Sequence, residues 1–326
     1  MDVPRMGLEL NDWLPLRERV ELARWAEDHG FDDAYVAEIT DPDAFVTCAL
    51  SVAATSRIRL GTCIIQIGPR TAPMLASGTA AVDAVGPGRF ALGIGVSSEA
   101  IISGWHGLSF EHLLTRARET VEAIRTILAG ERTKLLGDQV RSKGFQLAFP
   151  PASPPPIHLA ALNQGMLRLA GQVADGAWLN FVPVQRIDEV VAVIRDGADS
   201  AGRPAPEILL SILCDVTDDR AASLAAIKDL LTFYVSSPNY RAAFASYGFE
   251  QEMIDAAAAF ANRDKPGVLA AISDELADSI ALVGSEGEVR ERLMRYVDAG
   301  VTSPSVCALD RSRQLESLLA FARGKD

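Results

Sequence analysis

Polar residues follow several short apolar segments of this chain, at places where chemistry is possible. Glu38 closes one such segment, and a carboxylate at the end of a strand is a usual candidate for proton transfer. The alternative is a structural hydrogen-bonding role, and the sequence leaves both roles open for Glu38. Asp41 is better explained as a helix cap, because Pro42 follows it at the first helical position.

Two stretches rich in small residues could let a ligand approach the backbone. Residues 160–165 (AALNQG) join an apolar segment to a helical pattern, where backbone amides can surround a phosphate. An ordinary turn is the alternative. Residues 93–98 (GIGVSS) partly match the dinucleotide-binding pattern G-x-G-x-x-G, but the third glycine is missing and the stretch follows the fourth apolar segment. We interpret it as a strand end where the backbone approaches a flat ligand.

Other kinds of catalytic site have little support in the sequence. The motifs of serine hydrolases, zinc proteases and P-loop enzymes do not occur. His106 and His112 are close together in the chain but have no third ligand nearby, so we predict no metal site. The four cysteines lie far apart, which indicates free thiols in a reducing compartment.

The composition indicates a protein with a large core and an acidic surface. Of the 326 residues, 48% are hydrophobic, and the formal net charge is −12. An acidic surface repels a phosphate backbone, so we expect no nucleic-acid partner. The sequence shows neither a signal-peptide pattern nor an apolar stretch long enough to span a bilayer. We therefore expect a cytoplasmic protein that does not bind membranes.

Short apolar segments alternate with helical patterns along nearly the whole chain. We expect eight strands, at residues 7–11, 33–38, 58–65, 90–96, 157–161, 177–181, 208–216 and 305–309. Region 220–278 is helical and too long for one crossover, so we predict an insertion after strand seven. The proline cluster 150–156 is interpreted as a loop. This alternation favours a (β/α)8 TIM barrel, an α/β fold, as a single domain over residues 1–326.

Several longer stretches give the chain a resemblance to a known family. They are VAEITDPDAF (36–45), SRIRLGTCIIQI (56–67), GPGRFALGIGVSS (86–98), GWHG (104–107), LAALNQGMLRLAGQVADGAWLN (159–180) and ALVGSEGEVRERL (281–293). In their order and spacing the chain resembles the bacterial luciferase-like family of barrel oxidoreductases. It is most similar to the deazaflavin-dependent branch, which uses coenzyme F420. The resemblance extends over nearly the whole chain.

The resemblance implies a homodimer and a cofactor that lies across the strand ends of the barrel. It implies a cis peptide bond between Cys63 and Ile64 beneath the ring, backbone amides that hold the phosphate, and serine hydroxyls at the polar edge of the ring. The residues that it places at the cofactor are Thr62, Cys63, Ile64, Gly95, Val96, Ser97, Ser98, Ala161, Leu162, Asn163, Gln164, Gly165 and Asn180.

The implied reaction is hydride transfer between the deazaflavin and a small organic substrate. The protein would then supply alignment, exclusion of water and one proton donor, for which Glu38 and His106 are the candidates. Several relatives have a histidine directly after the strand-two acid, whereas this chain has Ile39, so the usual acid–base assignment does not carry over. We expect Trp105 to cap the substrate pocket, with a buried structural role as the alternative.

Two other functions stay open. The same barrel could use FMN and oxygen as a monooxygenase, or it could bind a cofactor without turning it over. The loops that would select the substrate carry no recognisable signature. The predicted partner is therefore a small or medium-sized organic molecule of unspecified identity.

Overall fold

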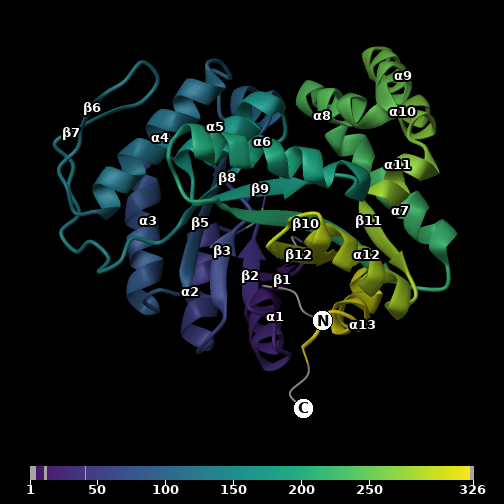
Figure 1. Cartoon of the computed structure of the whole chain (residues 1–326), viewed down its shortest axis with the longest axis horizontal. Coiled ribbons are helices and arrows are strands. Elements are labelled where there is room, and N and C mark those ends of the chain that lie inside the picture. Colours follow the sequence, from purple (N-terminus) through teal and green to yellow (C-terminus); the bar gives the residue numbers. More distant parts are fainter. Residues whose placement is uncertain (1–4, 11–12, 41, 324–326) are drawn as a thin grey trace.

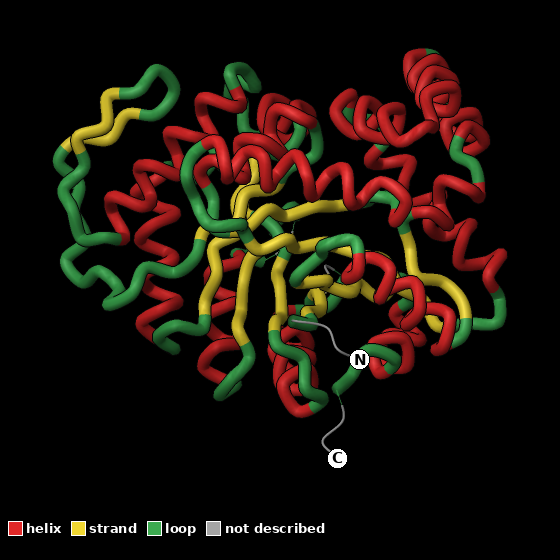
Figure 2. The backbone as a smooth tube through the Cα atoms, in the orientation of Figure 1, coloured by secondary structure: helices red, strands yellow, loops and turns green. Residues whose placement is uncertain are grey.

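The chain folds into a closed barrel of eight parallel strands surrounded by helices (Figures 1 and 2). The computed structural model describes residues 5–10, 13–40 and 42–323. The ring closes because β10 pairs with both β9 and β12, while β1 pairs with both β12 and β2. In ring order the strands are β1 (Gly7–Glu9), β2 (Asp33–Val36), β3 (Arg59–Thr62), β5 (Phe90–Gly95), β8 (Ile157–Ala160), β9 (Gly176–Asn180), β10 (Glu207–Val216) and β12 (Ser303–Ala308). The predicted (β/α)8 barrel is confirmed.

All eight predicted strand segments are present, with ends that differ by one to a few residues. The third segment is interrupted, because β3 ends at Thr62 and the short strand β4 (Ile65–Gln66) pairs with β5. Between them, the peptide bond joining Cys63 and Ile64 is cis, as the resemblance implied. Asn11, the expected end of the first strand, lies outside the described residues.

One further strand, β11 (Ala281–Gly284), was not predicted. It pairs with the second half of β10, beyond the residues of β10 that pair with β9. Four apolar residues between two helical patterns are too few to distinguish a strand from a helix end, which explains why the sequence did not reveal it.

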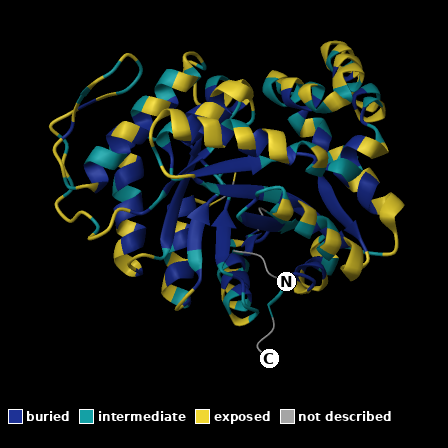
Figure 3. Cartoon of the chain, viewed as in Figure 1, coloured by how far each residue is buried: buried dark blue, intermediate teal, exposed yellow. Residues whose placement is uncertain are grey.

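Helices pack around the barrel with their apolar faces inward, and Figure 3 shows buried strands enclosed by helices whose outer faces are exposed. The helix α2 has Asp43 as its cap, since the Asp43 carboxylate accepts a hydrogen bond from the Val46 amide at 3.1 Å. The predicted cap at Asp41 is wrong, because the helix starts later than Pro42; Asp41 itself lies outside the described residues. The surrounding helices are α1 (Leu16–Asp28), α2 (Ala44–Ala54), α3 (Ala72–Val85), α4 (Leu113–Leu128), α5 (Gln164–Val173), α6 (Ile187–Ser200), α12 (Glu286–Asp298) and α13 (Gln314–Leu319).

Five helices form an insertion after β10, the seventh barrel strand, where residues 220–278 were predicted to insert. They are α7 (Arg220–Tyr234), α8 (Pro238–Phe244), α9 (Glu250–Ala261), α10 (Lys265–Ala271) and α11 (Asp274–Ser279). Buried side chains of the insertion, such as Ile227 and Met253, form one apolar cluster with Phe181 and Leu213 of the barrel. The insertion therefore packs onto the barrel. The single domain over residues 1–326 stays a prediction.

Shorter elements complete the description. An antiparallel hairpin of β6 (Lys134–Leu136) and β7 (Arg141–Lys143) extends beside α4 (Figure 1), and the proline cluster that follows is a loop, as predicted. Within the described residues, no helix has the length and apolar character needed to cross a membrane. The remaining short helical turns are η1 (Ala100–Trp105), η2 (Val184–Arg186), η3 (Ala245–Phe249) and η4 (Arg311–Arg313).

A charged network closes the N-terminal end of the barrel interior. Arg59 donates hydrogen bonds to Asp33 at 2.6 Å and to Glu207 at 2.7 Å, and His158 Nε2 lies 3.4 Å from Glu207. Burial raises the pKa of Glu207, but the nearby His158 ring and the hydrogen bonds from Arg59 outweigh it and hold this pKa well below its usual range. His158 therefore contributes to the end of the barrel opposite the mouth.

Candidate active site

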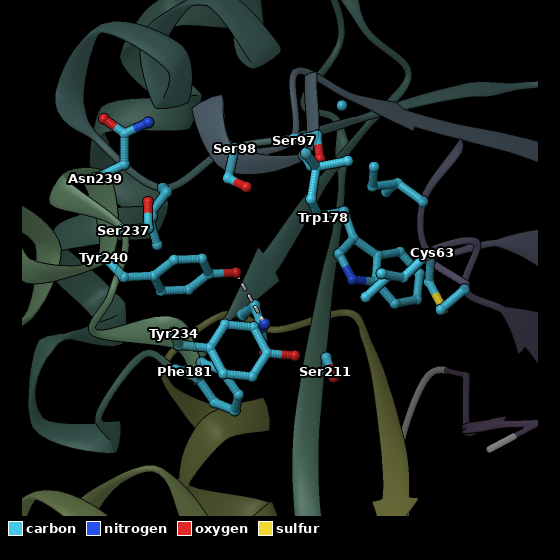
Figure 4. A pocket seen from close by; sticks show the side chains of 18 of the residues that line it. Cys63, Ser97, Ser98, Trp178, Phe181, Ser211, Tyr234, Ser237, Asn239 and Tyr240 are labelled. Carbon is cyan, nitrogen blue, oxygen red and sulfur yellow. Dashed lines mark hydrogen bonds between the residues drawn. The ribbon is translucent and has the colours of Figure 1, made fainter. Parts of the chain in front are cut away.

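A cavity of about 1020 Å³ opens at the C-terminal ends of the barrel strands. Strand ends form one wall, and α7 and the start of α8 in the insertion form the opposite wall (Figure 4). Ligand pockets of roughly 300–1,000 Å³ are typical for drug-sized molecules. This cavity is therefore large enough for a ring cofactor together with a small second molecule.

The barrel wall of the cavity is formed at the ends of β3 and β5. It includes Cys63, Ile64 and Gly95. A Cβ atom at Gly95 would lie 2.9 Å from the Cβ of Ala160, so glycine avoids a clash at this part of the wall. Trp178 lies beside these residues and packs edge-on against the buried Tyr35, with ring centroids 4.6 Å apart. Such a wall suits a planar ring.

Thr62 and Gly93 lie behind this wall and do not line the cavity. The Thr62 hydroxyl donates to the carbonyl of Gly93 at 2.7 Å and accepts from its amide at 2.9 Å. A Cβ atom at Gly93 would lie 1.8 Å from the Thr62 carbonyl oxygen. The glycine is thus required by the close approach of β3 and β5, and not by a ligand as we had expected. Thr62 is fully buried and does not line the cavity.

Two residues at strand ends have left-handed backbone conformations that favour glycine. Ser97 follows β5 with a φ of 62°, and Phe181 follows β9 with a φ of 53°. Each such conformation costs on the order of 1 kcal/mol and persists only where the surroundings fix it. Both residues line the cavity, as do Val96 and Ser98. Of these two residues, Ser97 is one that was predicted to contact the cofactor.

The predicted phosphate cradle lies at the N-terminus of α5. Asn163 caps this helix, because its side chain accepts a hydrogen bond from the Met166 amide at 3.2 Å. Ala161, Leu162 and Asn163 line the cavity, whereas Gln164 and Gly165 lie within the first turn behind it. The helix N-terminus is a favourable place for an anion.

Glu38 borders the cavity, but its carboxylate is occupied by the protein. Arg70 donates to both of its oxygens, at 3.0 and 2.8 Å, and the Ala44 amide donates to one of them at 2.9 Å. Hydrogen bonds from Arg70 to Glu38 and Asp43 raise the pKa of the Arg70 guanidinium despite its partial burial. These contacts favour the structural role that the sequence had left open for Glu38.

The two aromatic residues predicted near η1 differ in their placement. The Trp105 side chain lines the cavity and is 53% exposed, so it borders the mouth and is not a buried structural residue. His106 is exposed and lies outside the lining. His112, which we had set aside, does line the cavity at the start of α4.

The sequence analysis missed a carboxylate on the floor of the cavity. Glu9, the last residue of β1, is half-buried, and Ser211 of β10 donates a hydrogen bond to its Oε1 atom. Both residues line the cavity. The signal was available, because Glu9 ends the first strand just as Glu38 follows the second, and carboxylates at strand ends were the criterion for Glu38.

The wall that the insertion supplies was also missed, since nothing in the sequence indicates where the insertion packs. Tyr234 and Tyr240 stack edge-on with ring centroids 4.9 Å apart, and Phe181 lies 4.7 Å from Tyr234. Asn180 was predicted at the cofactor and lines the cavity, where its side-chain amide donates to the Tyr240 hydroxyl at 3.2 Å. Burial raises the pKa of Tyr240 more than Asn180 lowers it, so the phenol is neutral. Figure 4 shows this aromatic wall facing Trp178 and Cys63.

A cavity at the C-terminal mouth of a (β/α)8 barrel is where enzymes of this fold place their active sites, and the helix N-terminus beside it can bind an anionic group. The luciferase-like monooxygenase family matches residues 4–303 of this chain. The chain belongs to this family.

Known relatives span the full length of the chain. It is 32% identical to a protein of Mycobacterium tuberculosis named as a coenzyme F420-dependent oxidoreductase, over 97% of this chain and 98% of the relative. The structure of the coenzyme F420-dependent tetrahydromethanopterin reductase from Methanopyrus kandleri has a TM-score of 0.81 at 22% identity and covers 97% of both chains. The oxygenating constituent of 3,6-diketocamphane monooxygenase from Pseudomonas putida, in complex with FMN, has a TM-score of 0.70 at 20% identity and covers 98% and 96%. These two structures share the fold.

Proposed function

We propose that this chain is an F420-dependent oxidoreductase that transfers a hydride to or from a small organic substrate. The observation that carries the proposal is the cavity wall at Cys63, Ile64 and Gly95, together with the N-terminus of α5 at the same cavity. A planar ring and a phosphate fit these two features together. When bound, the deazaflavin supplies the carbon that gives or takes the hydride. The relative from M. tuberculosis supports the choice of cofactor.

Backbone and small side chains would hold this cofactor. Ala161, Leu162 and Asn163 line the cavity, and the Ala161 amide already donates to the Trp178 carbonyl at 2.9 Å. The amides of Leu162 and Asn163 would therefore bind the phosphate, with Gln164 and Gly165 contributing amides from the first turn of α5. The ring would rest on the wall at Cys63 and Ile64, next to Val96 and the two serines after β5. Asn180 lies across the cavity in contact with Tyr240, so its expected role at the cofactor stays a prediction.

The geometry favours Glu9 as the group that holds the reacting proton. Its carboxylate lies on the cavity floor and is positioned by Ser211, which leaves it close to a substrate between the two walls. Glu38 is bound by Arg70 and His106 lies outside the cavity lining, so both earlier candidates fit this role less well. The neutral aromatic wall would exclude water from the reacting atoms and pack against the substrate.

Two alternatives are an FMN-dependent enzyme and a cofactor-binding barrel without catalytic function. FMN is the second candidate cofactor, because a barrel of the same fold binds it. A barrel without catalytic function would be expected to have a mouth closed by the insertion. Instead, the side chains of α7 and α8 border an open cavity of about 1020 Å³.

We also propose that the protein is a cytoplasmic homodimer. The four cysteines are free thiols, which suits a reducing compartment. The neighbouring helices α2 and α3 expose Val46, Leu50, Met74 and Val85, each between 45% and 59%. Neither helix carries a charged side chain on its exposed face, since Asp83 of α3 is buried. A shared apolar surface of this kind favours pairing with a second copy.

A crystal of the protein soaked with coenzyme F420 would test the proposed function. We expect density for the ring over Cys63 and Ile64 and for the phosphate beside Ala161–Asn163. Density for the cofactor elsewhere on the surface, or a mouth that stays empty at saturating cofactor, would contradict the proposal.

A further inference from the structure

The hydroxyl of Tyr240 on α8 lines the cavity with its proton unused. Its oxygen accepts a hydrogen bond from the Asn180 side-chain amide at 3.2 Å. Figure 4 shows this bond, with the Tyr240 hydroxyl directed toward Trp178 across the cavity. Among the described residues the hydroxyl donates to no acceptor. A phenol can both accept and donate, so Tyr240 has a donor available for a bound molecule.

Asn180 fixes the direction of this hydroxyl. It is the last residue of β9, and its other polar side-chain atom, Oδ1, is buried without a hydrogen-bond partner in the part of the chain that the structure describes. Buried polar atoms in folded proteins are nearly always paired, so an amide with one unpaired atom calls for a reason other than stability. Orientation of the Tyr240 hydroxyl is such a reason.

The Asn180–Tyr240 pair lies next to the proposed proton-holding group. In the pairing of β9 with β10, Asn180 is opposite Ser211, whose hydroxyl donates to Glu9. Glu9, Ser211, Asn180 and Tyr240 all line the cavity. They therefore form one row of polar groups, and a substrate that reaches Glu9 lies beside the pair.

The lining around this row favours an uncharged substrate. Its carboxyl groups are those of Glu9, Glu38 and Asp229, and within the described residues neither lysine nor arginine lines the cavity. An anionic substrate would therefore lose its hydration without gaining a cationic partner. Trp178 and Tyr234 supply apolar surface on opposite walls. An apolar molecule with a neutral polar group fits this lining.

We propose that Tyr240, positioned by Asn180, is a specificity-determining residue that donates a hydrogen bond to a neutral oxygen of the substrate. The proposal deepens the proposed function and rests on it, because the cofactor ring is placed on the wall at Cys63 and Ile64. The apolar part of the substrate then packs between that ring and the aromatic side chains of the insertion. The substrate class is thus an uncharged carbonyl compound or alcohol with an apolar body.

Binding of two probes of nearly equal shape would test the proposal. Acetophenone has a carbonyl oxygen where α-methylstyrene has a methylene group, and neither is reduced when the cofactor is oxidised. Their dissociation constants would be measured by ligand-observed NMR on the intact protein, with and without oxidised F420. For the wild type we expect acetophenone to bind about tenfold more tightly than α-methylstyrene, as one buried hydrogen bond allows. Benzoate, the anionic probe, should bind less tightly than acetophenone.

Two tyrosine variants assign this preference to one hydroxyl. In Y240F the preference for acetophenone should fall to about twofold or less, while the dissociation constant of α-methylstyrene stays unchanged. Y247F is the matched control and should keep the full preference, because Tyr247 also belongs to the insertion but does not line the cavity.

Three results would overturn the proposal: equal binding of acetophenone and α-methylstyrene to the wild type, an equal preference in the wild type and Y240F, or no binding of either probe at its solubility limit. Failure of F420 to bind the wild type would instead contradict the proposed function. The titrations without cofactor would still report on Tyr240, so the two failures are distinguishable.

Discussion

Glu38 and Glu9 are both carboxylates at strand ends and both line the cavity, but different partners hold them. Residue type and position alone do not distinguish their roles. The difference lies in Arg70, 32 residues from Glu38 in the chain, which binds both carboxylate oxygens. A sequence pattern shows where a strand ends. It does not show which distant residue binds the side chain there, because tertiary packing brings the two residues together.

Replacement of Glu9 by Gln tests its role as the proton-holding group. A substrate would first be found by following the oxidation of the reduced cofactor. In turnover of this substrate, E9Q should lower kcat by roughly 100-fold or more. The dissociation constant of the cofactor should stay within about twofold of the wild type. E38Q is the matched control and should affect stability more than kcat. Equal kcat values for E9Q and the wild type would rule out this role.

At the scale of elements, the order of strands and helices was predictable because apolar periodicity reports it directly. Two local features at the cavity were predictable because each involves consecutive residues: the cis bond between Cys63 and Ile64, which the family resemblance implied, and the start of α5 after Leu162. The cofactor roles given to these residues stay predictions. The aromatic wall was not predictable, since Tyr234 and Tyr240 reach the barrel only through the packing of the insertion. The strand β11 was not predicted, because its four residues are too few to distinguish a strand from a helix end.

The contact between β3 and β5 provides a test at this scale. Gly93→Ala would place a Cβ atom 1.8 Å from the Thr62 carbonyl oxygen, so the strands must separate. We expect a loss of several kcal/mol in the free energy of unfolding, measured by urea denaturation, as for other overpacked core positions. Gly287→Ala is the control, because a Cβ atom there meets no atom within 4 Å and alanine favours the helix. A G93A protein as stable as G287A would contradict the described packing.

For the whole molecule, the charged end of the barrel makes stability depend on pH. The folded-state pKa of Glu207 lies below its ordinary value, so its contribution is present above about pH 4.3 and is lost as the pH falls further. Arg59→Met removes the guanidinium that bridges Asp33 and Glu207, although Arg5 still binds Asp33 at 2.7 Å, and should cost about 3 kcal/mol at pH 7. Urea denaturation at several pH values should show that the free energy of unfolding of R59M depends less on pH in the acid range than that of the wild type. An equal pH dependence of the free energy of unfolding in both proteins would show that this charged network does not cause it.

A second prediction for the whole molecule concerns the apolar surface on α2 and α3. Leu50→Glu and Met74→Glu place charges on the proposed dimer surface, which a dimer would have to bury. Sedimentation of the double variant should give the mass of one chain, and the wild type the mass of two. Leu136→Glu, on the exposed hairpin, is the control and should stay dimeric. A monomeric wild type would exclude the homodimer.

The cavity at the mouth of the barrel is the feature on which the proposed activity depends, and cofactor binding measures it most directly. Titration of the purified protein with coenzyme F420 and, separately, with FMN can be followed by the fluorescence of each ring. We predict saturable one-to-one binding of F420 with a dissociation constant at least tenfold lower than that of FMN. Tight binding of FMN with no detectable binding of F420 would contradict the account.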